Sequence, residues 1–339
     1  MNHETKFLFV LPLTLCENSM GKVYEPIIIG IDGGGSRTRG ILYKGEKELA
    51  QSETSTARVG TVGVVESAER ILNLISELIT LAKLPNRELD AVLIGLAGTW
   101  LKEEQLRSQQ LISLLAKRER KIDIDKLVVT SDAAIALDAA FEGEHGIVLI
   151  VGTGTIAIAK TPKGDFVRCG GWGIELSDEG SGAWIGREGL TAMARAFDGR
   201  GKWTAFADMM IKFFPTINPD LPRTFVAAYN ERAFDYSTVT PFVMECATNG
   251  DEVCMEIIER AATNLMANVT TLYGKYFKGK KVSVACVGGI MEADTILAKM
   301  VKKGIGKQEG LKVVEPKAVP LYGAVRMARE LVKKDQEDL

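Results

Sequence analysis

The chain has 339 residues, enough for two domains that each bury a core, and its 46% hydrophobic and 25% charged residues are ordinary for a globular protein. A formal net charge of −2 leaves no basic surplus for a nucleic-acid backbone or an anionic membrane, so we expect neither partner. Five dispersed cysteines and two distant histidines provide no clustered ligand set for structural zinc. The odd number of scattered cysteines favours a reducing, cytoplasmic setting.

Residues 1–25 are interpreted as an N-terminal extension. Within it, residues 7–15 (FLFVLPLTL) resemble the apolar core of a signal peptide, but they are too few to span a membrane, which takes about 20. The charged start is weak, and the residues before Cys16 lack the small side chain that processing sites prefer. We therefore favour Met20 as the native start, with residues 1–19 as an upstream extension.

The first predicted domain covers residues 26–140 and alternates strands with helices, which is typical of an α/β fold. Residues 27–31 form a continuous apolar, β-branched run, as expected of a buried strand, and the turn DGGGS follows at 32–36. The further elements predicted in chain order are strands at 38–43 and 47–52, a helix at 66–83 with Ser67 as a possible cap, a strand at 89–96, a helix at 103–118 and a strand at 127–130.

The second predicted domain, residues 141–320, repeats the start of the first. An apolar run at 147–151, the turn GTGT at 152–155 and a second run at 156–160 again give strand, glycine turn and strand. The two turns lie about one domain length apart, as in an internal repeat. The elements predicted after this hairpin are a long helical stretch at 180–276, strands at 281–287 and 311–314, each followed by a helix, the last of them at 321–334.

The paired glycine turns predict a clamp for the phosphates of ATP. Glycine permits positive φ and lets backbone N–H groups approach a ligand with no Cβ in the way. Each turn alone is explained equally well as a tight hairpin, whereas the pair favours the clamp. Asp32, at the end of the first strand, is placed to hold Mg²⁺ through water. The residues predicted to contact the phosphates are Gly34, Gly35, Ser36, Arg37, Thr153 and Gly154.

Asp132 is the predicted catalytic base. It follows the strand at 127–130, at the strand end where open α/β sheets place their ligands. A carboxylate there can accept the proton of a hydroxyl whose oxygen attacks phosphorus. Asp132 could equally cap a helix beginning at Ala133, and the two roles are compatible.

The segment 169–185 (CGGWGIELSDEGSGAWI) combines glycines, a tryptophan and an acidic pair. The flat apolar ring of Trp172 beside carboxylate acceptors suits a sugar. The alternative is an irregular loop before a helix, with Trp172 and Trp184 as core residues. Gly288 and Gly289, between a strand and a helix, would let a purine or ribose lie against the backbone.

Together these segments resemble the N-acetylglucosamine kinase group of the BadF/BadG/BcrA/BcrD-type ATPases, within the actin–hexokinase–Hsp70 superfamily. The resemblance covers residues 27 to about 329. Its motifs are DGGGSRT at 32–38, TSDAA at 130–134, GTGT at 152–155, CGGWG at 169–173, SDEGS at 177–181, ATNGD at 247–251, CVGG at 286–289 and YGA at 322–324.

The resemblance implies two ribonuclease-H-like domains with a nucleotide cleft between them, and a final helix, 321–339, that packs back on the first domain. It implies a homodimeric kinase that uses ATP and Mg²⁺ to phosphorylate a small sugar, at C6 of an amino sugar such as N-acetylglucosamine or glucosamine, or of a related hexose. The residues implied to bind sugar are Thr155, Gly171, Trp172, Gly173 and Asp178. Those implied to line the adenosine site are Gly288, Gly289, Thr240 and Ala293.

Two departures leave the choice of sugar open. The chain has Ala57-Arg58 where such kinases commonly place a sugar-binding Asn, and Thr155-Ile156 where they often have Ser-Asn. The alternative function is an ATPase that activates a radical dehydratase or reductase through an iron–sulfur cluster held by cysteines of two subunits. Cys169 and Cys286 follow strand-like segments, which disfavours that reading. A non-catalytic sugar sensor is disfavoured by Asp132.

Overall fold

The computed structural model describes residues 24–337 and contains two mixed, five-stranded sheets. In the first sheet the strand order is β3-β2-β1-β4-β5. β1, β2 and β3 form an antiparallel meander, and β4 and β5 then run parallel to β1. The strands are β1 (Ile27–Gly33), β2 (Arg37–Lys44), β3 (Lys47–Ser55), β4 (Glu88–Leu96) and β5 (Asp123–Thr130).

The second sheet has the same topology, with the order β10-β9-β6-β7-β8. β6, β7 and β8 are antiparallel, whereas β9 runs parallel to β6 and β10 parallel to β9. The strands are β6 (Gly146–Val151), β7 (Thr155–Lys160), β8 (Phe166–Gly170), β9 (Val282–Val287) and β10 (Leu311–Val314). The predicted α/β fold of two ribonuclease-H-like units, with the second repeating the first, is therefore confirmed.

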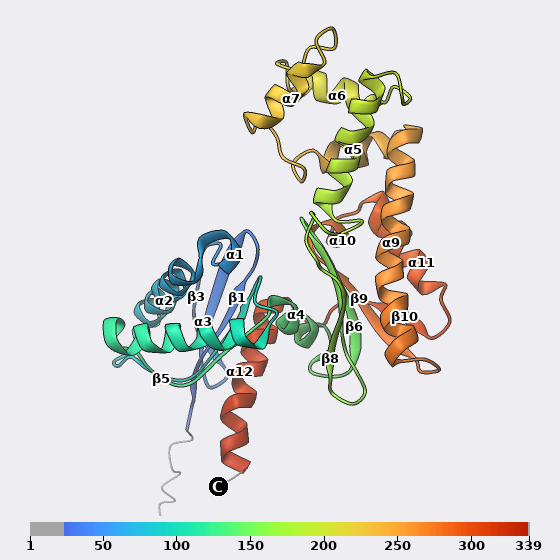
Figure 1. Cartoon of the computed structure of the whole chain (residues 1–339). Helices are drawn as coiled ribbons and strands as arrows, with labels where there is room; N and C mark the ends of the chain where they lie inside the picture. Colours follow the sequence, from blue (N-terminus) through green and yellow to red (C-terminus); the bar gives the residue numbers. More distant parts are fainter. Residues whose placement is uncertain (1–23, 338–339) are drawn as a thin grey trace, which may run out of the picture.

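Helices lie on both faces of each sheet (Figure 1). α2 (Val64–Leu81) and α3 (Lys102–Leu115) pack on the outer face of the first sheet, and α9 (Glu252–Tyr276) and α11 (Ile296–Gly306) pack on the outer face of the second. Between the two sheets lie α4 (Asp132–Phe141) and α12 (Pro320–Glu337).

α4 is the element that joins the two sheets. Its residues from Ala133 to Phe141 are all buried; they are apolar except for Asp138, which pairs with Arg326 of α12. Ile135 packs against β1 and β4 of the first sheet, whereas Leu137 and Phe141 pack against the second. The N-terminus of this helix is therefore fixed between the two sheets.

Two glycines allow the central helices to lie directly on the first sheet. A Cβ at Gly30 in β1 would be 2.7 Å from the backbone nitrogen of Val325 in α12. A Cβ at Gly95 in β4 would be 2.4 Å from Cδ1 of Ile135 in α4. α12 thus packs directly on the first sheet. The predicted domain limits, residues 26–140 and 141–320, stay a prediction.

The long helical stretch predicted at 180–276 is divided into five helices. Side-chain caps begin three of them: Ser181, Thr204 and Asp251 each accept a hydrogen bond from a backbone N–H of the first turn. The helices are α5 (Gly182–Phe197), α6 (Ala205–Phe213), α7 (Arg223–Asn230), α8 (Thr240–Thr248) and α9. In Figure 1, α6 and α7 extend beyond the second sheet.

Some elements differ from the prediction. Ser67 is not the cap of α2, because the helix begins after Gly63 and the Ser67 hydroxyl donates to the carbonyl of Ala57 instead. Strand β8 was not predicted, since its sequence FVRCG contains one arginine and ends in the glycine-rich loop. The remaining short elements are α1 (Val59–Val62), the π-helical turn Ala116–Arg120 after α3, and α10 (Gly289–Glu292).

The features predicted within residues 1–23 lie outside the described residues. From residue 24 to residue 337, no helix combines the length and the apolar character needed to cross a membrane.

Candidate active site

A cleft of about 390 Å³ opens between the two sheets, at the N-terminus of α4. It brings together both glycine turns, the predicted base and the glycine-rich loop after β8. Its lining residues are Gly35, Ser36, Arg58, Ala97, Gly98, Thr99, Trp100, Ser131, Asp132, Ala133, Ile150, Gly152, Thr153, Gly154, Thr155, Ile156, Arg168, Gly171, Gly173 and Asp178.

Asp132 is the first residue of α4, and it does not cap this helix. Ser131 is the N-cap, and its hydroxyl accepts a hydrogen bond from the backbone nitrogen of Ala134 at 3.2 Å. The Asp132 carboxylate accepts one from its neighbour Ala133 at 2.9 Å and faces the cleft. Because the cap position is filled by Ser131, the carboxylate of Asp132 remains available to a ligand.

Loss of hydration in the cleft raises the pKa of Asp132 to about 6. The nearby carboxylate of Asp32 acts in the same direction, whereas the backbone N–H of Ala133 and the charge of Arg58 act against it. A general base works best when its pKa lies near the working pH. The environment of Asp132 therefore suits a carboxylate that takes a proton near neutral pH.

Asp178 connects the loop after β8 to the second glycine turn. Its side chain is buried, its φ is +60°, and its Oδ1 accepts a hydrogen bond from the backbone nitrogen of Gly173 at 3.1 Å. A Cβ at Gly154 would lie 2.8 Å from Oδ2 of Asp178, so glycine is needed for this approach. Burial raises the pKa of Asp178, while the backbone N–H groups of Gly173 and Thr155 oppose the rise.

The two glycine turns differ in how they are supported. The first is closed by a hydrogen bond from the backbone nitrogen of Gly34 to the carbonyl of Arg37, at 2.9 Å. The second rests on the start of α5, where Gly182 and Ala183 donate to the carbonyls of Gly152 and Thr153 at 2.8 and 3.1 Å. Both turns line the same cleft, which is the arrangement that a two-sided phosphate clamp requires.

Trp172 and Trp184 have different environments. Trp184 is 4% exposed and belongs to the core, whereas Trp172 is 61% exposed. The guanidinium of Arg168, in β8, lies 4.1 Å from the centre of the Trp172 ring and 5.1 Å from that of Trp100, which follows β4. These cation–π contacts link the two sheets across the cleft. Stacking of a sugar on Trp172 stays a prediction.

Several predicted residues lie outside the lining of the cleft. Asp32 is buried and pairs with Arg39 at 2.7 Å. Arg37 pairs with Glu53 at 3.6 Å, and the hydroxyl of Thr240 donates to the carbonyl of Gly182. The other predicted residues that do not line the cleft are Gly34, Trp172, Gly288, Gly289 and Ala293.

The second carboxylate oxygen of Asp32, not used in the pair with Arg39, is the group that could hold Mg²⁺ together with a nucleotide. Residues 24–337 contain no group of three or more His, Cys, Asp or Glu side chains that could hold a metal ion by themselves. Mg²⁺ is commonly held by one or two carboxylates together with substrate phosphates and water. The carboxylate of Asp32, at the end of β1 beside the first turn, fits that mode.

Arg168 was missed by the sequence analysis because strand β8 was not predicted. Alternation along β8 places Arg168 and Gly170 on the same face, and Nη1 of Arg168 donates to the carbonyls of Gly170 and Gly171 at 2.8 and 3.0 Å. A basic residue just before a CGGWG motif is the signal that could have indicated it.

Within residues 24–337, Cys169 and Cys286 do not form the exposed pair that a cluster between two subunits would need. Cys286 is buried within β9, and burial raises the pKa of its thiol to about 11. Cys169 lies near Asn268, with its sulfur 3.5 Å from Oδ1. The geometry thus gives the electron-transfer alternative no support.

Comparisons with known proteins agree with this geometry. The model of the BadF/BadG/BcrA/BcrD ATPase family matches residues 29–328. The N-acetylmuramic acid/N-acetylglucosamine kinase of Clostridium acetobutylicum is 28% identical over 309 residues, covering 89% of this chain and 98% of the relative. The N-acetyl-D-glucosamine kinase of Dictyostelium discoideum is 26% identical over 317 residues, covering 90% and 98%.

A solved structure supports the fold. The crystal structure of a protein from Chromobacterium violaceum, with the proposed name N-acetylglucosamine kinase, superposes with a TM-score of 0.69 at 24% identity. The match covers 89% of this chain and 98% of that one. At this identity the structural similarity shows the fold and not the activity.

Proposed function

The chain belongs to the BadF/BadG/BcrA/BcrD ATPase family, and on this premise we propose that it is an ATP-dependent sugar kinase. It transfers the γ-phosphate of ATP to a hydroxyl, at C6, of an amino sugar such as N-acetylglucosamine or glucosamine, or of a related hexose. The names of its relatives support a sugar as the acceptor.

The observation that carries this proposal is the position of Asp132 in one cleft with both glycine turns and Asp178. Asp132 takes the proton of the sugar hydroxyl, whose oxygen forms a bond to the γ-phosphorus as the bond to the β-phosphate oxygen breaks. ADP leaves, and the proton stays on Asp132 until water removes it. Phosphoryl transfer depends chiefly on such positioning and on stabilisation of charge.

The backbone N–H groups of the two turns hold the phosphates, with the hydroxyls of Ser36 and Thr153 as further donors. Asp32 would hold Mg²⁺ through water, and the ion would supply neutralisation of charge at the phosphates. Adenosine lies along Gly288 and Gly289, near Thr240 and Ala293. A phosphate clamp built from backbone groups needs no Walker-type lysine.

The acceptor sugar lies on the opposite side of Asp132, between the second turn and the loop after β8. Asp178 is its main hydrogen-bond acceptor, because this carboxylate lines the cleft and the backbone nitrogen of Gly173 holds its Oδ1 in place. Gly171 and Gly173 have φ of +73° and +88° and carry no Cβ, which leaves room for a sugar ring beside Thr155 and Trp172. The expected homodimer and cytoplasmic setting remain part of the proposal.

The proposal is tested by measuring ADP release with ATP and Mg²⁺ over N-acetylglucosamine, glucosamine, glucose, N-acetylmannosamine and N-acetylmuramate. We expect at least one sugar to stimulate ADP release and to gain one phosphoryl group, with the carbon that carries it identified by NMR. ATP hydrolysis that no sugar stimulates would favour the electron-transfer ATPase instead.

A further inference from the structure

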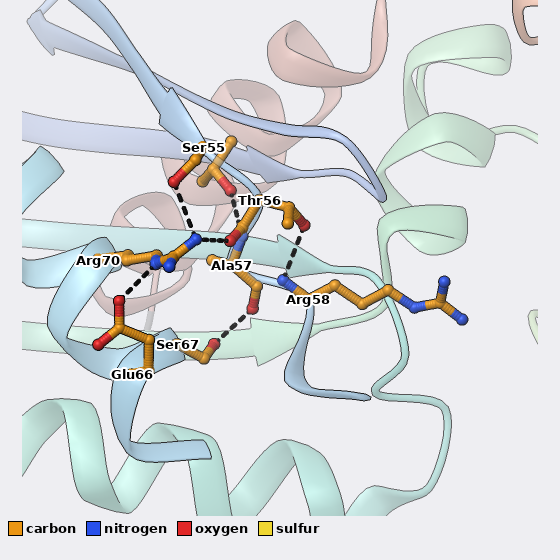
Figure 2. Close-up of polar contacts among 8 residues, drawn as sticks. Ser55, Thr56, Ala57, Arg58, Glu66, Ser67 and Arg70 are labelled. Atoms are coloured by element: carbon orange, nitrogen blue, oxygen red, sulfur yellow. Dashed lines mark hydrogen bonds and ion pairs between the residues drawn. The ribbon is translucent and has the colours of Figure 1, made fainter. Parts of the chain in front are cut away.

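Arg58 enters the cleft from a segment whose backbone is held firmly in place. The segment follows β3, and Figure 2 shows Ser67 and Arg70 bonded to its main chain. The backbone nitrogen of Arg58 donates to the hydroxyl of Thr56 at 3.1 Å, and Thr56 in turn donates to the carbonyl of Gly34 at 3.0 Å. Ala57 is held on both sides, by Thr38 at 2.9 Å and by Ser67 at 2.6 Å.

Arg70 of α2 completes this support. Its guanidinium donates to the carbonyl of Thr56 at 2.8 Å and to the hydroxyl of Ser55 at 2.9 Å, and its Nε donates to Glu66 at 2.7 Å. These contacts tie the segment to α2, and the bond from Thr56 to Gly34 ties it to the first glycine turn. The direction of the Arg58 side chain is therefore set by a fixed main chain.

The side chain of Arg58 takes no part in that network. Figure 2 shows it extending away from the labelled residues that hold its backbone. It lines the cleft, and among the residues that the structure describes its guanidinium makes no hydrogen bond or ion pair. Its stem passes Gly98, where an added Cβ would lie 3.6 Å from the Cγ of Arg58.

The other cations near the cleft already have partners. Arg39 pairs with Asp32, and Arg37 pairs with Glu53. Arg168 donates to two carbonyls and lies against two tryptophan rings. Arg58 is thus the cation lining this cleft, within residues 24–337, whose guanidinium makes no hydrogen bond or ion pair.

The charge of Arg58 acts on the acceptor side of the cleft. Its field lowers the pKa of both Asp132 and Asp178, against the larger effect of burial. A neutral sugar offers only hydroxyl or amide oxygens, which need no charged partner. The two carboxylates would repel an anionic sugar unless a nearby cation offset them, and the planar fork of a guanidinium matches a carboxylate with two parallel hydrogen bonds.

We propose that Arg58 selects an acceptor sugar that carries a carboxylate substituent, which it binds through its guanidinium. This inference rests on the proposed sugar kinase function and narrows its substrate class. Arg58 holds the substituent, while Asp178 binds the ring hydroxyls and Asp132 accepts the proton. The side chain of Ala57, before Arg58, carries no polar group, so within this dipeptide only Arg58 can bind a sugar substituent through its side chain.

The experiment compares N-acetylmuramate, its methyl ester and N-acetylglucosamine as acceptors for the wild-type chain, Arg58→Gln and Arg58→Lys. The ester keeps the shape of the substituent and removes its charge. We expect the wild-type kcat/KM to be highest for N-acetylmuramate. Arg58→Gln should lower that value by about 10- to 100-fold, the range of a charge-assisted hydrogen bond, and leave the two neutral sugars within about threefold.

Arg58→Lys should recover part of the loss, because it restores the charge without the planar fork. Arg107→Gln is the matched control, since it removes one exposed positive charge from α3 outside the cleft. An equal loss for all three sugars with a raised KM for ATP would overturn the inference and make Arg58 a phosphate ligand. Equal use of the charged and neutral sugars by the wild-type chain would also overturn it, while leaving the kinase function intact.

Binding without ATP separates the two proposals. The fluorescence of Trp100 and Trp172, beside the cleft, gives the Kd of each sugar. We expect tighter binding of N-acetylmuramate than of its ester in the wild-type chain, and no difference in Arg58→Gln. If no sugar stimulates ADP release, the proposed function fails by that result alone, and the binding comparison still decides whether Arg58 recognises a carboxylate.

Discussion

Gly154 and Asp178 approach each other so closely that a single added methyl group would separate them. Oδ2 of Asp178 lies 2.8 Å from the position of a Cβ at Gly154. This contact joins the second glycine turn, proposed to bind phosphate, to the loop after β8, proposed to bind sugar. The two proposed substrates are therefore bound by segments that touch each other.

Gly154→Ala should weaken sugar binding more than ATP binding. The new methyl group displaces the Asp178 carboxylate, and a shift of about 1 Å at such a site can cost about 100-fold in rate. Steady-state KM values for sugar and ATP measure the effect. Gly274→Ala is the control, because a Cβ there meets open space. An unchanged sugar KM in Gly154→Ala would remove Asp178 from the sugar site.

Asp132→Asn should retain ATP binding and lose turnover by about 100- to 10,000-fold, the usual contribution of a general base. The amide keeps the size of the side chain but cannot accept the proton. Nucleotide binding by calorimetry, beside kcat from ADP release, checks both parts. Turnover near that of the wild-type chain would exclude Asp132 as the base.

The same substitution should stabilise the fold at neutral pH. Because the pKa of Asp132 is raised from 3.8 to about 6 in the folded chain, the folded state binds more protons than the unfolded state between these values. The free energy of unfolding contributed by this group therefore falls as the pH rises through that window, by up to about 3 kcal/mol. The Tm of Asp132→Asn should exceed that of the wild-type chain at pH 7.5 and approach it near pH 4.

The rate should follow the ionisation of the same carboxylate. Below pH 6, kcat/KM should fall about tenfold per pH unit, because only the ionised form of Asp132 accepts a proton. The residual activity of Asp132→Asn should lack this acidic limb. A wild-type rate that stays level down to pH 4.5 would contradict the raised pKa.

Gly323→Ala should destabilise the chain by about 1–3 kcal/mol, the cost of overpacking a well-packed contact. A Cβ at Gly323 in α12 would lie 2.1 Å from the carbonyl oxygen of Ile135 and 2.9 Å from the nitrogen of Ala139. Both are backbone atoms of α4, which cannot move aside cheaply. Urea unfolding measures the loss, with Gly306→Ala as a control in open space.

The sequence predicted the fold well where the signal lies within one short segment. Apolar β-branched runs such as 27–31 identified the buried strands, and the repeated glycine turns indicated the internal repeat that the two sheets confirm. Strand β8 was missed because Arg168 interrupts its apolar pattern, and Ser67 was misread because its hydroxyl bonds to Ala57 across the fold. Contacts between distant segments leave no periodic signal in the sequence.

The candidate site was predictable to a similar extent. Asp132 and the two turns were found from strand ends and glycines, and the structure brings them to one cleft. Within residues 24–337 the guanidinium of Arg58 has no partner, and this could not be foreseen, because it depends on every neighbouring side chain. The same holds for the pairing of Asp32 with Arg39, which lie side by side on β1 and β2.

Trp172→Ala should raise the sugar KM more than the ATP KM, because Trp172 stands between Gly171 and Gly173 in the loop that is proposed to hold the acceptor. Loss of the ring also removes one of the two aromatic contacts of Arg168. Trp203→Ala, which removes an exposed tryptophan far from the cleft, is the control. A larger change in the KM for ATP would move Trp172 out of the sugar site.

The most direct test of the account is the rate of ADP release by the purified chain with ATP and Mg²⁺, measured with and without added amino sugar. We expect sugar to raise this rate strongly, the sugar to gain one phosphoryl group for each ADP formed, and Asp132→Asn to lower both by at least about 100-fold. ADP release that is the same with and without every sugar tested would contradict it.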